Sequence, residues 1–232
     1  MIRLRKAAER GQADHGWLKS AHTFSFAEYH DPAFMGYSVL RVINDDVIAP
    51  GTGFGMHPHR NMEIVTYVLE GVLRHQDSMG NGAEIRAGEV QRMSAGSGIR
   101  HSEFNASESV PVHLLQIWIV PERNNLVPGY EQMAIPADEK RAGWRPIATP
   151  DGCAGSLTIH QHAMLLATML GEGAQAQYHP ADDRRLYLHL ARGTVLLNGA
   201  AMEAGDGAFI EQENMVTLSN AQDAEALLFD LP

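Results

Sequence analysis

The chain has one cysteine and no long apolar segment. Cys153 is the single cysteine among 232 residues, so an internal disulfide is excluded and a reducing, cytoplasmic location is favoured. No stretch approaches 18 apolar residues, and the basic N-terminal MIRLRKAAERG is not followed by an apolar segment. We therefore expect neither export nor a membrane span.

Basic residues are also scarce. The chain has 18 Lys and Arg against 28 Asp and Glu, giving a net charge of −10, and the basic residues do not cluster. Binding to nucleic acid requires clustered Lys and Arg that neutralise phosphates, so the composition disfavours nucleic acid as a partner. The apolar content of 44% is enough for the core of one large β domain or of two smaller ones.

Short apolar runs separated by Gly, Asn and Asp characterise the first half of the chain. They lie at residues 37–44, 64–70, 72–76, 89–93 and 112–120. Strand-length runs bounded by turn residues are typical of antiparallel sheets, and no amphipathic helix stands out. Residues 121–151 then hold five prolines and many charges, which is typical of a linker.

Two short motifs carry the most informative residues. GTGFGMHPHRNME spans residues 51–63, and GIRHSEFN spans residues 98–105. Side chains at i and i+2 of a strand point to the same face, so His57 projects with His59, and His101 projects with Glu103. Three imidazoles and one carboxylate suit a divalent first-row ion, and the absence of thiolates argues against a closed structural zinc site.

Other histidines offer alternatives. His160 and His162 also have i, i+2 spacing, but no carboxylate stands in phase with them, so we rank this pair below the first. His75, His113 and His189 lie in alternating apolar segments and are interpreted as structural. The aromatic N-terminal segment is interpreted mainly as core, with Phe24 and Phe26 as an alternative pair lining a pocket for an aromatic ring.

The motifs resemble those of the cupins. Gly51, His57, His59 and Glu63 follow the first cupin motif, and Gly88, Gly96, His101 and Asn105 follow the second. HGWLKSAHTFSF at residues 15–26, FGMHPHRNMEIVTYVLEG at 54–71 and MSAGSGIRHSE at 93–103 are similar to the pirin family. Within that family they resemble the bacterial pirin-like proteins described as quercetin 2,3-dioxygenases.

The resemblance to pirins implies a ligand set. Its members here are His57, His59, His101 and Glu103. Relative to the general cupin pattern, the spacing from Glu63 to Gly71 is one residue longer and His101 comes two residues later. The carboxylate role therefore passes from Glu63 to Glu103. Glu63 lies an even number of residues from His59, so the two side chains would point to the same face of a strand. Two roles are open for Glu63: it accepts a hydrogen bond from the N–H of a ligand histidine, or it is a hydrogen-bonded residue of the barrel without a chemical role.

An internal repeat indicates two barrels. LYLHLARGTVLLNGAAMEAGDGAFI at residues 186–210 resembles residues 65–93, with Gly193 in the place of Gly71. In the repeat His179 stands alone, so we expect the second barrel to hold no metal. The prediction is an all-β bicupin with two antiparallel, jelly-roll-like barrels. Residues 1–125 form a metal-binding domain, residues 126–150 a linker, and residues 151–232 a domain without metal.

The resemblance also implies a reaction. It is a metal-dependent cleavage of a quercetin-like flavonol by O₂ to a depside and carbon monoxide, with Glu103 as ligand and catalytic base. Fe(II) is the first expectation for the ion, with Ni, Co, Mn, Cu and Zn as alternatives. A protein of this family can instead be a regulator that binds other proteins through the same metal-loaded fold. We expect a monomer or weak oligomer.

Overall fold

A computed structural model describes all 232 residues and divides them into two compact units. The N-terminal unit comprises Gly11–Ala134 and Leu157–Gln161, and the C-terminal unit comprises Met1–Arg10, Ile135–Ser156 and His162–Pro232. Apart from α1 (Ala137–Arg141) and the 3-10 turns η1 (Ala7–Glu9) and η2 (Cys153–Gly155), the regular structure is β. The predicted all-β fold with two antiparallel domains is confirmed.

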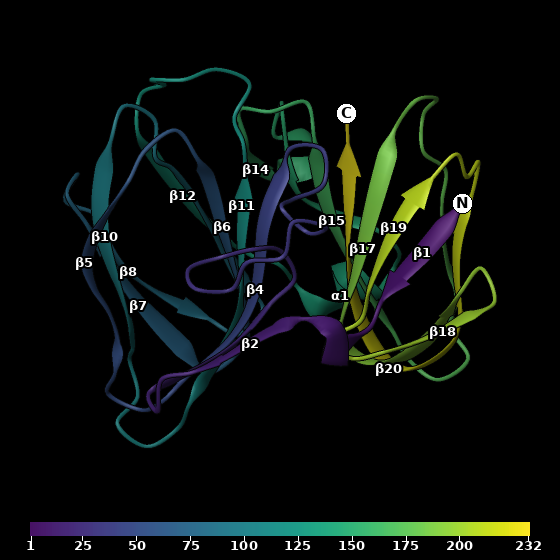
Figure 1. The fold of residues 1–232 in the computed structure, drawn as a ribbon, viewed down its shortest axis with the longest axis horizontal. Helices are drawn as coiled ribbons and strands as arrows, with labels where there is room; N and C mark the ends of the chain where they lie inside the picture. The colour runs from purple at the N-terminus through teal and green to yellow at the C-terminus, as the bar shows by residue number, and fades with distance from the viewer. The chain divides into compact units, whose positions relative to one another are not determined.

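The N-terminal unit consists of two antiparallel sheets that face each other (Figure 1). The larger sheet has the order β12 (Gly129–Ala134), β9 (Glu89–Ser94), β6 (Glu63–Glu70), β11 (Val112–Ile119), β4 (Leu40–Ile48), β3 (Leu18–His22), β2 (Gly11–Asp14). The smaller sheet has the order β5 (Gly53–His59), β10 (Ile99–Asn105), β7 (Val72–Asp77), β8 (Gly82–Arg86). Four of the five predicted strand segments match β6, β7, β9 and β11 to within one residue at each end, while β4 is shifted toward the C-terminus.

The core of the N-terminal unit is divided in two. On β6, Ile64 packs in one apolar cluster and Val68 in another, while Thr66 lies between them on the same face. On β11, Gln116 occupies the same position between Trp118 and Leu114. Polar side chains therefore cross the inner face of the larger sheet at the level where the apolar core is interrupted. Buried polar groups require partners, so this level is where a site is expected.

The C-terminal unit is built around one sheet and one large apolar cluster. The sheet has the order β1 (Ile2–Arg5), β19 (Gly207–Glu211), β17 (Arg185–Leu197), β20 (Val216–Leu231), β15 (Met164–Leu170), β13 (Arg145–Thr149), with β16 (Ala176–Tyr178) on β20 and β18 (Ala200–Glu203) on β17. Its interior is closely filled by Leu, Ile, Val and Ala side chains.

Two glycines that the repeat aligned have the same conformation. Gly71 has φ 78° and Gly193 has φ 71°, a left-handed region that glycine enters without steric cost. A Cβ added at Gly71 would lie 2.7 Å from the carbonyl oxygen of Pro111, and one added at Gly193 would lie 2.2 Å from that of Gln222. Both positions thus require glycine for the same reason, a bend that brings the strand against a neighbouring backbone.

The boundaries of the units differ from the predicted 1–125, 126–150 and 151–232. The first ten residues belong to the C-terminal unit, because β1 pairs with β19. The predicted linker contains β12, which pairs with β9, and β13, which pairs with β15. Leu157–Gln161, with β14 (Leu157–Thr158), is part of the N-terminal unit. Strands at the edge of a sheet pair through backbone hydrogen bonds. A segment rich in proline and charge can therefore contain such strands although its composition resembles that of a linker.

No helix of the structure has the length and apolar character needed to cross a bilayer.

Candidate metal centre

Strands β5 and β10 bring three histidines together. The two strands are antiparallel neighbours, and His101 is the cross-strand partner of His57. His59 follows two residues later on the same face of β5. The ring centroids of His57, His59 and His101 lie 4.4 to 4.9 Å apart. Their nitrogens form one group in which the ligand atoms lie within 4.8 Å of one another.

The hydrogen bonds of these rings leave nitrogens for a metal. Both ring nitrogens of His101 are buried without a hydrogen-bond partner. The Nδ1 of His57 lies 2.7 Å from the carbonyl oxygen of Gly55, so Nδ1 carries the proton and the lone pair of Nε2 is left for a metal. A neutral imidazole has one N–H and one lone pair, and His101 has no partner for either. A divalent ion fits this donor set, because it is the partner that the nitrogens lack.

Glu103 belongs to an adjoining group around His101. His75, His101 and Glu103 form a second cluster with ligand atoms within 4.8 Å of one another, in which all three are buried. The register explains it, since Glu103 on β10 pairs with His75 on β7. The carboxylate accepts a hydrogen bond from Gln116 Nε2 at 2.9 Å and one from Thr66 Oγ1 at 3.3 Å. Glu103 therefore adjoins the cluster of three histidines through His101, but it is not a member of that cluster.

The sequence interpretation of His75 as structural omits this neighbourhood. Its ring lies 5.3 Å from that of His101 and 5.0 Å from that of Tyr130, and its side chain is fully buried. Its Nε2 faces the Asp77 carboxylate at 3.5 Å. The alternation of side chains along β7 and β10 places His75 on the same face as Glu103. This relation can be recognised only once the two strands are known to pair.

Burial controls the charges of the site. Burial, and then the charge of His57, lowers the pKa of His59 to about 4, and burial lowers the pKa of His101 further. Both imidazoles are therefore neutral at physiological pH, the form that binds metals. Burial raises the pKa of Glu103 to about 7, and the nearby Asp46 carboxyl raises it too, against the hydrogen bonds from Thr66 and Gln116.

Glu63 lies elsewhere. Its carboxylate is fully buried, with Oε2 accepting a hydrogen bond from Ser94 Oγ at 2.8 Å and facing His160 Nδ1 at 3.4 Å. It therefore does not accept an N–H from His57 or His59. The rival pair separates as well, because His160 turns to Glu63 while His162 lies 3.3 Å from the guanidinium of Arg184. They form no ligand cluster.

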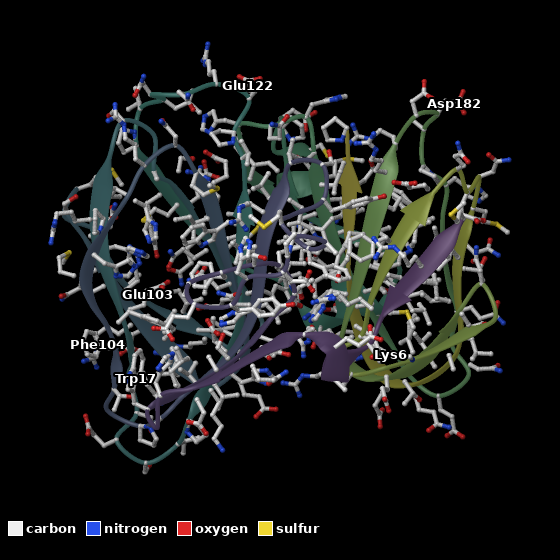
Figure 2. All side chains as sticks on the ribbon, viewed as in Figure 1. Lys6, Trp17, Glu103, Phe104, Glu122 and Asp182 are labelled. Atoms are coloured by element: carbon white, nitrogen blue, oxygen red, sulfur yellow. The ribbon has the colours of Figure 1, made fainter.

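A cavity of about 360 Å³ opens onto His57 and His59. Trp17 and Glu103 both line it (Figure 2). Its aromatic walls are the edge-to-face pairs Trp17–Phe54 and Phe26–Trp118, with ring centroids 5.0 and 5.3 Å apart. The alternative that Phe24 lines a pocket together with Phe26 holds for Phe26 alone, because Phe24 is buried in the core as the first interpretation expected.

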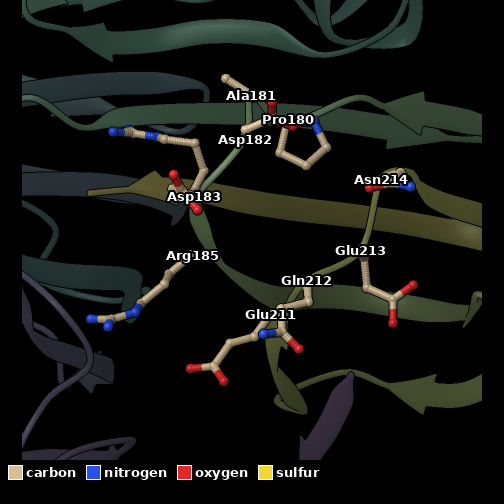
Figure 3. Close-up of a pocket in the computed structure, with 10 residues that line it drawn as sticks. Pro180, Ala181, Asp182, Asp183, Arg185, Glu211, Gln212, Glu213 and Asn214 are labelled. Atoms are coloured by element: carbon tan, nitrogen blue, oxygen red, sulfur yellow. The ribbon is translucent and has the colours of Figure 1, made fainter.

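A larger hollow of about 720 Å³ lies in the C-terminal unit (Figure 3). Its lining is mainly charged, with Asp182, Asp183 and Arg185 facing Glu211 and Glu213. No cluster capable of binding a metal lies there, and His179 is exposed. We therefore place the chemistry in the smaller cavity of the N-terminal unit.

This combination of fold and site defines a pirin-type cupin. The Pirin family model matches residues 3–119, and the model of the Quercetinase C-terminal cupin domain matches residues 146–231. The chain belongs to the pirin family. The predicted bicupin and the predicted resemblance are confirmed.

Similar proteins extend over the whole chain. A protein named Quercetin 2,3-dioxygenase from Escherichia coli (strain K12) is 52% identical over 232 residues, which cover 100% of this chain and 99% of that protein. A Pirin-like protein from Caulobacter vibrioides is 43% identical, with 99% of both covered. The crystal structure of the bacterial pirin YhhW from Escherichia coli in complex with nickel(II) matches with a TM-score of 0.95 and 51% identity, covering 100% of this chain and 99% of that one. The chain is thus a quercetin 2,3-dioxygenase-like member of the cupins, and a divalent metal is supported by both the histidine cluster and this relative.

Metal affinity should depend on pH through Glu103. If Glu103 is a ligand with a pKa of about 7 in the metal-free protein, binding displaces its proton below pH 7. We expect the affinity for Ni(II) to rise about tenfold per pH unit up to about pH 7 and then to level off. His59 and His101 add nothing in this range, because their pKa values lie far lower. Calorimetric titration in buffers of different ionisation enthalpy counts the released proton.

The matched variant is Glu103→Gln, whose affinity should be weaker and less dependent on pH across the same range. Release of three or more protons near pH 6 would contradict the expectation, since it would show that His59 or His101 is protonated before the metal binds.

Proposed function

We propose that this chain is a metal-dependent dioxygenase that cleaves a flavonol with O₂, giving a depside and carbon monoxide. The observation that carries the proposal is the cluster of His57, His59 and His101 beside a cavity with aromatic walls, in which both ring nitrogens of His101 lack a partner. The cavity volume lies within the range of small-molecule sites, and its mostly apolar lining suits a planar aromatic substrate. The name of the relative from Escherichia coli supports the same reaction.

We propose His57, His59, His101 and Glu103 as the metal ligands. A divalent ion held there would supply the positive charge that lowers the pKa of the substrate's 3-hydroxyl beside its 4-keto group. Fe(II) remains our first candidate for the bound ion. Ni(II) is an equal candidate, because the relative from Escherichia coli forms a nickel(II) complex.

Glu103 is proposed to take the hydroxyl proton. Burial raises its pKa to about 7 in the metal-free protein, which makes the carboxylate a stronger proton acceptor than an exposed glutamate, although a bound cation would offset part of that shift. Gln116 and Thr66 hold the carboxylate in place between them. Trp17, Phe26 and Phe54 restrict the flavonol to a plane that brings the hydroxyl toward Glu103.

The test is aerobic incubation of metal-loaded protein with quercetin. We expect loss of the flavonol absorbance band over many turnovers per bound metal, together with release of carbon monoxide. Loss of only one quercetin per metal, or no loss, would contradict the enzyme and favour a metal-binding regulator that acts through protein contacts.

A further inference from the structure

A row of polar side chains crosses the larger sheet of the N-terminal unit. The register aligns Thr66 on β6, Gln116 on β11, Asn44 on β4 and His22 on β3, so all four point to the inner face. Asn44 and Asp46 share that face by their i, i+2 spacing on β4. The Thr66 end of the row holds Glu103, as described above. The other end, Asn44 with Asp46 next to it on β4, also lines the cavity.

Hydrogen bonds fix the orientation of the Asn44 amide. Its Oδ1 lies 2.8 Å from Nδ1 of His22, which donates, so the amide oxygen is occupied. Nδ2 consequently points the other way and has no partner in the protein. Asn44 is only 3% exposed, yet it lines the cavity. A buried amide with two unused N–H groups needs an acceptor from a ligand or water.

Asp46 offers a complementary group. One of its oxygens, Oδ1, accepts a hydrogen bond from Ser20, while Oδ2 has no partner in the protein. The residue is 3% exposed and also lines the cavity. A substrate hydroxyl can donate a hydrogen bond to Oδ2, which an amide nitrogen in the same place could not accept. A donor and an acceptor thus stand side by side on two largely buried residues that line the cavity.

The spacing of Asn44 and Asp46 from Gln116 limits which molecules can contact the whole row. Gln116, which contacts Glu103, is the cross-strand neighbour of Asn44, and Asp46 lies two residues further along β4. Strand spacing puts the Asp46 backbone on the order of 8 Å from that of Gln116. A planar ring system with polar substituents at both ends spans such a distance between the aromatic walls. A molecule with a single polar end leaves Asn44 and Asp46 unpaired.

We propose that Asn44 and Asp46 form a specificity element that recognises a hydroxyl group at the end of a planar aromatic substrate remote from its metal-chelating end. The substrate class is therefore polyhydroxylated flavonols or similar bicyclic phenols, rather than any molecule with a chelating hydroxy-ketone. The inference rests on the proposed function for the orientation of the substrate. Its test measures binding and is independent of turnover.

The probes are quercetin and 3-hydroxyflavone, which share the chelating group but differ in their remote hydroxyls. Both are titrated without O₂ into nickel-loaded protein, and the ratio of the two dissociation constants is the readout. We expect the wild-type protein to prefer quercetin by about 10- to 100-fold, the worth of hydrogen bonds to buried polar and charged groups. Asp46→Asn, and independently Asn44→Ala, should reduce the preference to within about threefold.

Asp45→Asn is the matched control. Asp45 precedes Asp46 on β4, points to the opposite face and lies 2.6 Å from Nε2 of His113, so the preference should remain that of the wild type. Metal content and circular dichroism verify that each variant is folded, and Asn44→Ala keeps the test decisive should Asp46→Asn not fold.

Three results would overturn the inference: no preference in the wild type, no binding of either probe, or equal weakening of both probes in Asp46→Asn. If quercetin is preferred but never consumed in air, the proposed reaction fails while the specificity element stands.

Discussion

Replacing both His57 and His59 by alanine is expected to abolish metal binding and turnover while leaving the fold intact. The variant loses two of the three imidazoles that converge at the centre. Loss of groups that merely orient a metal ligand costs 10- to 100-fold in affinity, so loss of two ligands should exceed about 100-fold. Elemental analysis after purification without added metal, followed by the quercetin assay, measures both effects.

The fold should survive because both side chains are only half-buried and lie on β5, an edge strand of the smaller sheet. The variant and the metal-free wild type should therefore melt at similar temperatures, since bound metal alone accounts for the difference between holo and apo protein. His162→Ala combined with His179→Ala removes the same number of imidazoles from exposed positions and should retain the metal. Full metal occupancy in the His57, His59 variant would refute the assignment.

Glu103→Gln is expected to lower turnover per bound metal by about 10² to 10⁴, the usual contribution of a general base. The amide fills the same space, but it cannot accept the substrate proton at neutral pH. The rate must be expressed per metal, because an amide oxygen is also a poorer ligand and the occupancy will fall. Reloading the variant with excess Ni(II) or Fe(II) before the assay separates the two effects.

Glu122→Gln, at an exposed site of the same unit, is the matched control and should behave as wild type (Figure 2). Turnover per metal within a few-fold of wild type would leave Glu103 as a ligand alone. Glu63 cannot replace Glu103 as the base, because its carboxylate contacts Ser94 and His160 instead of the metal centre. Asp46, the other carboxyl that lines the cavity, takes that place.

Much of the metal centre follows from local spacing. HPH and HSE each place two side chains on one face of a strand, because alternation is a property of any extended backbone. The same local logic gave the predicted β segments and the two repeat glycines, Gly71 and Gly193, whose left-handed φ values the structure shows. These features needed no knowledge of which strands are neighbours.

Pairing between distant strands decided the rest. His75 becomes a neighbour of Glu103 because β7 lies beside β10, and Gln116 reaches Glu103 from the opposite sheet. Likewise β1 joins the C-terminal unit and β12 the N-terminal one through backbone hydrogen bonds that any side chain permits. The sequence by itself therefore determined the ligand types, the β class and the repeat. Only the tertiary structure decided the unit boundaries and the groups that surround the ligands, since contacts between remote segments depend on sheet register, which local spacing does not encode.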